Sequence, residues 1–165
     1  EKRTTQKVSV PHGNKIVLNN GGGKEQAYYD ANVLAGLNEQ MSEFEAVSKI
    51  NNWLCETLIY EMGYVLPPEV LESGKAQCEG YSLLFYAMCR NASIECNIVS
   101  GKTKDSSGKF ANGHTWNQVK IGDTWYYIDV CWNDVNAAPN RYFLTEKLWG
   151  DHKVSYVSEY GTVYF

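Results

Sequence analysis

The residues best suited to chemistry in this chain are a cysteine, a histidine and an aspartate in three separate segments: Cys78, His114 and Asp129. The stretch "GKAQCEGYSLLF" changes at Cys78 from small polar residues to an apolar run with helical spacing. This change predicts that Cys78 begins a helix, where unpaired backbone N–H groups and the helix dipole stabilise a thiolate. Its own N–H could then help to form an oxyanion hole, and Gly80 would let a substrate approach closely.

A predicted β-hairpin brings His114 and Asp129 together. The sequence "IGDT" is typical of a two-residue turn, because glycine supplies a positive φ at the first central position. This turn pairs Ile121 with Thr124, which places His114 and Asp129 on one face of the sheet as diagonal neighbours. Such neighbours lie about 7–8 Å apart at the backbone, within reach of a side-chain contact. A shift of one residue would send them to opposite faces.

Other aspartates suit His114 less well. Asp123 lies in the turn, Asp134 falls on the other face beyond the strand end, and Asp105 lies in a polar insert. An imidazole held by a carboxylate can accept a proton from a thiol, which gives the thiolate–imidazolium pair of nucleophilic catalysis. Each residue also has a structural alternative: a buried thiol, a core or surface histidine, and an aspartate bonded to local backbone. The three together, in this order, favour catalysis.

Two helices are predicted to come before the strands. The first runs from Ser42 to Met62, because apolar residues recur there at helical spacing and Ser42 forms a capping box with Glu45. Gly63 is a natural end for this helix. The second helix runs from Cys78 to about residue 90. Residues 64–77 are predicted as a loop, because they contain two consecutive prolines.

Strand-like segments follow these helices. They lie at 94–101, 114–121 and 124–132, with a weaker one at 141–145 and an isolated one at 15–18; the polar insert 102–113 is predicted as an exposed loop. Helices first and strands after predict an α+β fold with an antiparallel sheet. The catalytic cysteine would then sit at a helix N-terminus packed against that sheet.

The composition is that of one globular domain. The chain has 165 residues, of which 44% are apolar and 21% charged. A net charge of −4 without any basic cluster argues against a nucleic-acid partner. No apolar stretch approaches the roughly 20 residues of a membrane span. We expect residues 1–25 to form a polar stalk or linker and residues 26–165 to form the domain. Since the chain starts with Glu1, we expect a processed protein or a piece of a longer one.

The five cysteines show neither Cys-x-x-Cys pairs nor zinc-ligand spacing, so we expect no metal. Their odd number leaves at least one thiol unpaired within the monomer. We expect most of them to be reduced and buried. In a secreted protein, Cys89 and Cys96 could pair across a short turn.

Three segments resemble the transglutaminase-like superfamily, especially its bacterial members: "GKAQCEGYS", "GHTWNQVKIGDTWYYIDVCWND" and "RYFLTEKLWGDHK". The resemblance covers residues 42–153 and implies a papain-like, transglutaminase-core fold. Carried over by position, it implies Cys78 as nucleophile, His114 as base and acid, and Asp129 as the residue that orients His114. It also implies that Trp116 and Trp132 wall the substrate cleft.

The oxyanion-hole side chain stays open among Gln77, Trp53 and Tyr81. His152 resembles a histidine common near the family's C-terminus, and we expect a structural role for it. The chain departs from the family pattern at Cys131, where threonine is frequent, and at Ser93, where glycine is common. The candidate residues of the substrate cleft are Trp116, Trp132, Gly80, Gln77 and Tyr81.

The resemblance implies thiol-mediated acyl transfer or hydrolysis at a protein or peptide amide, through a thioester on Cys78. The alternatives are a cysteine protease or amidase acting on cell-wall peptides, and a non-catalytic binding or scaffold module that keeps the fold. No cofactor is expected, and no acidic loop of the D-x-[DN]-x-[DN]-G kind supports calcium dependence. We expect an extracellular or bacterial cell-surface location, and the oligomeric state stays open.

Overall fold

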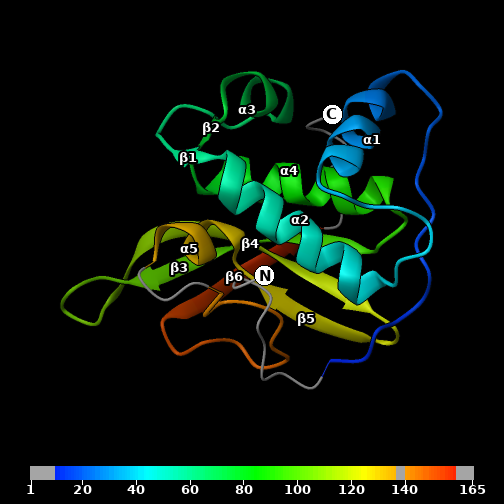
Figure 1. Cartoon of the computed structure of the whole chain (residues 1–165). Helices are drawn as coiled ribbons and strands as arrows, with labels where there is room; N and C mark the ends of the chain where they lie inside the picture. Colours follow the sequence, from blue (N-terminus) through cyan, green and yellow to red (C-terminus); the bar gives the residue numbers. More distant parts are fainter. Residues whose placement is uncertain (1–9, 137–139, 159–165) are drawn as a thin grey trace.

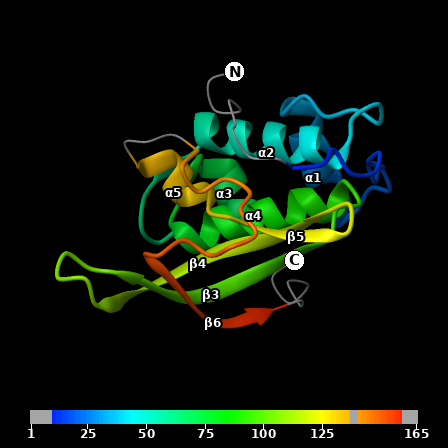
Figure 2. The ribbon, with the colours of Figure 1, turned by 90° about the horizontal axis from the view of Figure 1, so that it is seen from below.

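A four-stranded antiparallel sheet with helices on one face forms the framework (Figure 1, Figure 2). The computed structural model describes residues 10–136 and 140–158. The strand order is β5-β4-β3-β6, with β3 (Cys96–Lys104), β4 (Phe110–Ile121), β5 (Thr124–Ile128) and β6 (His152–Ser158). The predicted α+β class with an antiparallel sheet is confirmed.

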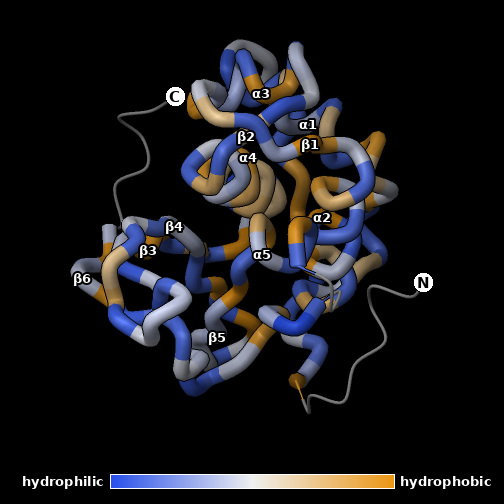
Figure 3. Tube along the Cα trace, turned by 90° about the vertical axis from the view of Figure 1, so that its left-hand side faces the viewer, coloured by the Kyte–Doolittle hydropathy of each residue, from blue (hydrophilic) through white to orange (hydrophobic). Residues whose placement is uncertain are grey.

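Helix α4 lies at the centre of the helical layer. This helix (Cys78–Asn91) packs against β3 and β4. Four other helices contact it: α1 (Lys24–Leu34), α2 (Glu43–Thr57), α3 (Pro67–Ser73) and α5 (Val130–Val135). Eleven of the 14 residues of α4 are buried. Apolar segments of α2, α4 and the strands meet in the interior (Figure 3). A helix buried on nearly all sides is a rigid support for the residue at its start.

Helix α2 begins as predicted and ends earlier. The Ser42 hydroxyl accepts a hydrogen bond from the Glu45 N–H at 3.3 Å, and the Glu45 carboxylate accepts one from the Ser42 N–H at 3.0 Å. The helix ends at Thr57 because the following residues form β1 (Ile59–Tyr60), which pairs in parallel with β2 (Lys75–Ala76). The predicted continuation to Met62 is therefore wrong.

The predicted loop 64–77 contains helix α3. Pro67 and Pro68 occupy its first turn, where a backbone N–H would have no helical partner in any case. The Glu69 carboxylate accepts hydrogen bonds from the N–H groups of Val65 and Leu66, at 3.1 and 3.2 Å. The two prolines therefore start a helix here.

The polar insert 102–113 is mostly strand. Strands β3 and β4 extend into it as a hairpin, and only a short turn remains at its tip. There the Asp105 carboxylate accepts hydrogen bonds from the N–H groups of Ser107 and Lys109, at 2.8 and 3.1 Å. The predicted loop is therefore wrong over most of this segment. Two solvent-exposed strands can pair through their backbones without apolar side chains, so the polar composition gave no sign of them.

The pairing of Ile121 with Thr124 is confirmed. Strand β5, however, ends at Ile128, and the residues after Asp129 form α5. The predicted strand 124–132 is therefore wrong beyond Ile128. The reason is a helix cap: the Asp129 carboxylate accepts a hydrogen bond from the Trp132 N–H at 3.1 Å.

The weaker strand predictions correspond to single bridges, Lys15 with Ser42 and Tyr127 with Thr145. Helix α1 and strand β6 were not predicted. Among the described residues, no helix has the length and apolar character needed to cross a membrane.

Candidate active site

Cys78 is the first residue of α4. The preceding Gln77 is the N-cap residue, with extended backbone and no side-chain capping bond to the helix. The first N–H groups of a helix have no helical acceptor, so the thiol lies beside unpaired donors and the positive end of the dipole. Cys78 is partly exposed, whereas the other four cysteines are buried.

A serine one turn along fixes the start of α4 to the sheet. The Ser82 hydroxyl lies 2.9 Å from the Cys78 carbonyl oxygen and 3.0 Å from the carbonyl oxygen of Thr115. Thr115 follows His114 on β4. The Asn117 side chain adds a second tie, because its amide donates to the Ser82 carbonyl at 3.1 Å. These contacts fix the position of Cys78 relative to His114.

His114 lies between Cys78 and Asp129. Its Nε2 is 2.8 Å from Asp129 Oδ2, and its ring is hydrogen-bonded to the Cys78 side chain. Because Nε2 is engaged by the carboxylate, Nδ1 is the nitrogen left for the thiol. Asp129 is completely buried and His114 is 8% exposed. The contact between His114 and Asp129 expected from the hairpin register is confirmed.

The charges in this cluster stabilise one another. Burial disfavours the imidazolium form of His114, but the charge and hydrogen bond of Asp129, helped by the hydrogen bond of Cys78, raise the pKa of His114 to about 10. Burial also disfavours ionised Asp129, yet its two histidine neighbours lower the pKa of this carboxyl. Burial raises the pKa of Cys89 and Cys131, so these two remain thiols.

A second histidine contacts the same carboxylate. His152 Nε2 is 2.7 Å from Asp129 Oδ2, and its Nδ1 is 2.8 Å from Asp151 Oδ1. The Tyr142 hydroxyl donates to Asp151 Oδ2 at 2.7 Å. His152 was expected to have a structural role only, and its position beside Asp129 was not predicted.

His114, Asp129 and His152 together could also be considered as metal ligands, since their atoms lie within 4.8 Å of one another. Two ligands bound to one ion at about 2.1 Å with tetrahedral geometry lie about 3.4 Å apart. The separations of 2.8 and 2.7 Å from Asp129 Oδ2 are instead those of hydrogen bonds. The donor set therefore fits a proton network better than a metal.

Cys78 and His114 open into a cleft of about 390 Å³. The cleft is lined by Tyr60, Cys78, Gly113, His114, Cys131, Trp132 and Val135. Tyr60 and Val135 are 43% and 51% exposed, so apolar surface borders the thiol. Tyr60 reaches the cleft through the β1–β2 pairing, which was not predicted because α2 was expected to run past it.

A comparison with protein families shows which family the chain belongs to. The model of the transglutaminase-like superfamily matches residues 31–130, more than half of the 165-residue chain. The chain belongs to the transglutaminase-like superfamily. The resemblance found in the three sequence segments is thereby confirmed, and the matched range contains Cys78, His114 and Asp129.

Two curated proteins are similar to this chain over part of their length. Kyphoscoliosis peptidase from Mus musculus is 31% identical over 110 residues, and the Homo sapiens protein is 30% identical over 110 residues. These matches cover 58% of this chain and 17% of each relative. The chain thus spans about a sixth of the curated proteins that it matches.

Two solved structures share the fold of this chain. A candidate cysteine protease from Cytophaga hutchinsonii matches 75% of this chain with a TM-score of 0.52 and 19% identity. A protein described as a TGase matches 81% with a TM-score of 0.54 and 17% identity. This chain covers 43% and 38% of those two chains. At such identities the likeness concerns the fold alone.

Of the cleft residues implied by the superfamily resemblance, the structure brings Trp132 to the cleft wall. Trp116 is completely buried and stacks behind His114, with ring centroids 5.8 Å apart. Tyr81 is also completely buried, and its hydroxyl donates to Asp134 at 2.6 Å. These two aromatic residues support the site from behind.

Two of the remaining candidates, Gly80 and Gln77, lie at the start of α4, and Trp53 lies on α2. A Cβ added at Gly80 would lie 2.5 Å from the Tyr64 carbonyl oxygen, so close packing explains this glycine. Gln77 is partly buried, and its side-chain oxygen accepts the Gly63 N–H at 2.7 Å. Trp53 lines a different, shallow cavity with residues of α1 and α2.

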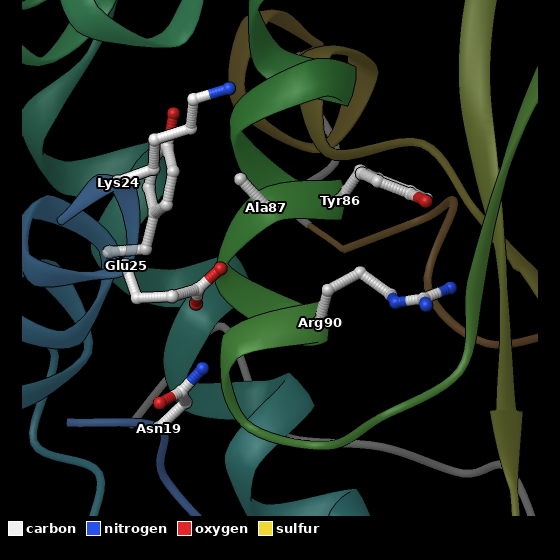
Figure 4. Close-up of a pocket in the computed structure, with 7 residues that line it drawn as sticks. Asn19, Lys24, Glu25, Tyr86, Ala87 and Arg90 are labelled. Carbon is white, nitrogen blue, oxygen red and sulfur yellow. The ribbon is translucent and has the colours of Figure 1, made fainter. Parts of the chain in front are cut away.

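A further cavity of about 340 Å³ lies between α1 and the far half of α4 (Figure 4). It is lined by Asn19, Lys24, Glu25, Tyr28, Tyr86, Ala87 and Arg90. Tyr86 is eight residues beyond Cys78, or about 12 Å along the helix. This cavity contains no thiol, histidine or aspartate, so the chemistry belongs to the cleft at Cys78.

Proposed function

We propose that this domain is a cysteine enzyme that transfers or hydrolyses the acyl group of a protein or peptide amide through a thioester on Cys78. The observation that carries the proposal is His114, which is bonded to buried Asp129 through Nε2 at 2.8 Å and contacts the thiol at the start of α4. This arrangement supplies a nucleophile, a base and a group that orients the base.

The first steps of the proposed reaction form the thioester. His114 Nδ1 takes the proton from Cys78, and the thiolate attacks the carbonyl carbon of the amide. The pair of electrons of the C=O bond moves to oxygen, which gives a tetrahedral oxyanion. When this intermediate collapses, the C–N bond breaks and the His114 imidazolium protonates the leaving amine.

The second half-reaction releases the acyl group. His114, now neutral, takes a proton from water or from a second amine as that nucleophile attacks the thioester. The C–S bond breaks, and Cys78 is restored as a thiol when the imidazolium returns the proton. Water as nucleophile gives hydrolysis, and an amine gives transfer.

The N–H of Cys78 is the proposed main-chain donor to the oxyanion. Gln77 is the proposed side-chain donor, because it directly precedes Cys78 and its side-chain oxygen, rather than its NH₂ group, accepts the Gly63 N–H. Tyr81 and Trp53 suit this role less well, since one is bonded to Asp134 and the other lines a separate cavity.

Peptide amides are the proposed substrates. The curated relatives are named peptidases, which favours hydrolysis. Amine transfer is the second candidate reaction, because a thioester can be attacked by an amine as well as by water. The expectation of an extracellular or cell-surface location makes cell-wall peptides a further proposed substrate class.

Selective alkylation tests the reactive thiol. At pH 7, iodoacetamide is expected to label Cys78 at least about tenfold faster than the four buried cysteines, because only Cys78 combines exposure with a base. His114→Ala should slow this labelling, whereas His12→Ala, a change at an exposed histidine, should not. Equal, slow labelling of all five cysteines would exclude the enzyme and favour the binding or scaffold module.

Product analysis tests the reaction class. The chain is incubated with peptide substrates, cell-wall peptides and glutamine-containing peptides, each with and without a primary amine. New N-termini indicate hydrolysis within a peptide, release of ammonia from glutamine indicates deamidation, and an amine-linked product indicates transfer. Cys78→Ala should abolish every one of these products.

A further inference from the structure

His152 is a buried histidine that the proposed reaction does not use. It is 3% exposed, and it is the first residue of β6, the edge strand that pairs with β3. Both ring nitrogens lie within hydrogen-bond distance of a carboxylate oxygen: Nε2 at 2.7 Å from Asp129 and Nδ1 at 2.8 Å from Asp151. A neutral imidazole has one N–H and could donate to only one of them.

Both carboxylates are ionised and have no proton to give. Burial disfavours the charged form of each. The charge of His114 and the hydrogen bonds of both histidines lower the pKa of Asp129, and the hydrogen bonds of Tyr142 and His152 lower the pKa of Asp151. Asp129 Oδ2 also accepts from His114, and Asp151 Oδ2 accepts from Tyr142. The protons in the two short contacts must therefore come from His152.

The surroundings of the ring favour a cation. The indole rings of Trp116, Trp132 and Trp149 each have their centroids 4.8 Å from the centroid of His152. The negative face of an aromatic ring attracts a cation within about 6 Å of the ring centroid. These rings also exclude water, so the two carboxylates must compensate for burying a charge on the imidazole. Two carboxylates and three indoles thus enclose one imidazole.

We propose that His152 is held as a doubly protonated imidazolium between Asp129 and Asp151, and that it is a positioning residue which limits how strongly Asp129 retains the proton on His114. This inference rests on the proposed function of the Cys78 site. A fully buried Asp129 with His114 as its one charged partner would stabilise the His114 imidazolium further. A base that also protonates a leaving group must release its proton, so an unshared carboxylate would hinder the second role.

The groups that face this network come from several elements. His114 faces Asp129 from β4, Asp151 and Tyr142 approach His152 from the segment before β6, and Cys78 contacts His114 from α4. Removal of the positive charge of His152 leaves the cluster more negative. Formation of the Cys78 thiolate then requires a higher pH.

Nitrogen NMR of the histidine side chains tests the protonation directly. In the full chain labelled with ¹⁵N-histidine, we expect both ring nitrogens of His152 to carry a directly bonded proton at pH 7. Assignment uses the loss of the corresponding signals in His152→Gln, with His12→Gln as the reference for a solvent-exposed ring. A His152 ring with one unprotonated nitrogen at pH 7 would overturn the proposal, whatever the outcome for Cys78.

The pH dependence of Cys78 alkylation tests the effect on the site. His152→Gln should raise the pH of half-maximal labelling by about one unit, because the loss of a positive charge from the cluster disfavours the thiolate. Asp151→Asn should raise the pH of half-maximal labelling by less. This change removes the negative charge of Asp151 together with the second proton of His152, so the two changes in charge partly cancel. His12→Gln should leave it unchanged.

The outcomes separate the two proposals. Failure of Cys78 to label selectively in the unchanged chain would contradict the proposed function, and the NMR result would still decide the state of His152. Selective labelling with the same half-maximal pH in His152→Gln and Asp151→Asn, even with a lower Tm, would show that His152 is merely structural and would overturn this inference.

Discussion

At the scale of single residues, the carboxylate of Asp129 organises the site. One oxygen contacts both His114 and His152, and the other caps α5 through the Trp132 N–H. The two histidine contacts are buried and the Trp132 bond is partly buried, so these bonds are stronger than they would be in water. The residue that holds His114 therefore also fixes the helix that carries a cleft wall.

A pair of matched aspartate variants tests this assignment. Asp129→Asn should lower Cys78-dependent turnover by about 100-fold or more, because an amide NH₂ cannot accept from two imidazoles and the base loses its orientation. Asp134→Asn should lower turnover by less than about tenfold, since Asp134 bonds Tyr81 away from the thiol. Turnover and Tm are measured for both. A larger loss of turnover in Asp134→Asn would contradict the assigned roles.

At the scale of elements, helix α4 is the part that positions the nucleophile. Its first turn packs so tightly that a Cβ at Gly80 would lie 2.5 Å from the Tyr64 carbonyl oxygen and 2.9 Å from the Ala76 Cβ. Both neighbours belong to the segment that leads into Cys78. The glycine therefore sets how closely the helix start approaches β2 and the loop before α3.

Replacement of this glycine should displace the helix start. Gly80→Ala is expected to destabilise the fold by about 1–3 kcal/mol through overpacking, and to slow the alkylation of Cys78 at pH 7. The matched control is Gly150→Ala, because nothing lies within 4 Å of a Cβ at that position. Urea unfolding and alkylation rates check both. Equal stability of the two variants would show that the packing at Gly80 tolerates a methyl group.

At the scale of the whole molecule, the site joins segments that are far apart in the sequence. Cys78 comes from the helical layer, His114 from β4, and His152 from β6, the edge strand on the far side of β3. A charged network that spans these layers should make global stability depend on pH. The structure supplies the direction of that dependence.

The sign follows from His114. Its folded-state pKa of about 10 is above the ordinary value of 6.5, so the stability from its protonation is fully present below about pH 6.5. This contribution declines above that pH and is lost as the pH rises through about 10. Urea unfolding between pH 6 and pH 10.5 should show a decline on the order of a few kcal/mol. Asp129→Asn should flatten it, and an equally steep decline in that variant would contradict the role of this pair.

The local features of the site were predictable from the sequence. The capping box at Ser42, the helix start at Cys78 and the turn that pairs Ile121 with Thr124 are all encoded by residues that are neighbours in the chain. The turn fixes the pairing of the two strands, and this pairing predicted that His114 and Asp129 lie on the same side of the sheet. Such signals need no knowledge of the rest of the fold.

Other features depended on contacts between distant segments. Strand β6 is paired with β3 rather than with a sequence neighbour, so the approach of His152 to Asp129 had no local signal. The end of β5 was misplaced because Asp129 also caps a helix. Likewise, Trp116 and Trp132 have the same residue type and similar sequence surroundings, and only packing decides which one borders the cleft.

The sequence by itself predicted the helix start at Cys78 and the contact between His114 and Asp129, because periodicity and turn geometry act over a few residues. Only the tertiary structure decided that Asp129 is shared between two histidines, that Tyr60 borders the cleft and that Tyr81 does not. These facts depend on which buried surfaces come together, and burial is a property of the whole packed molecule.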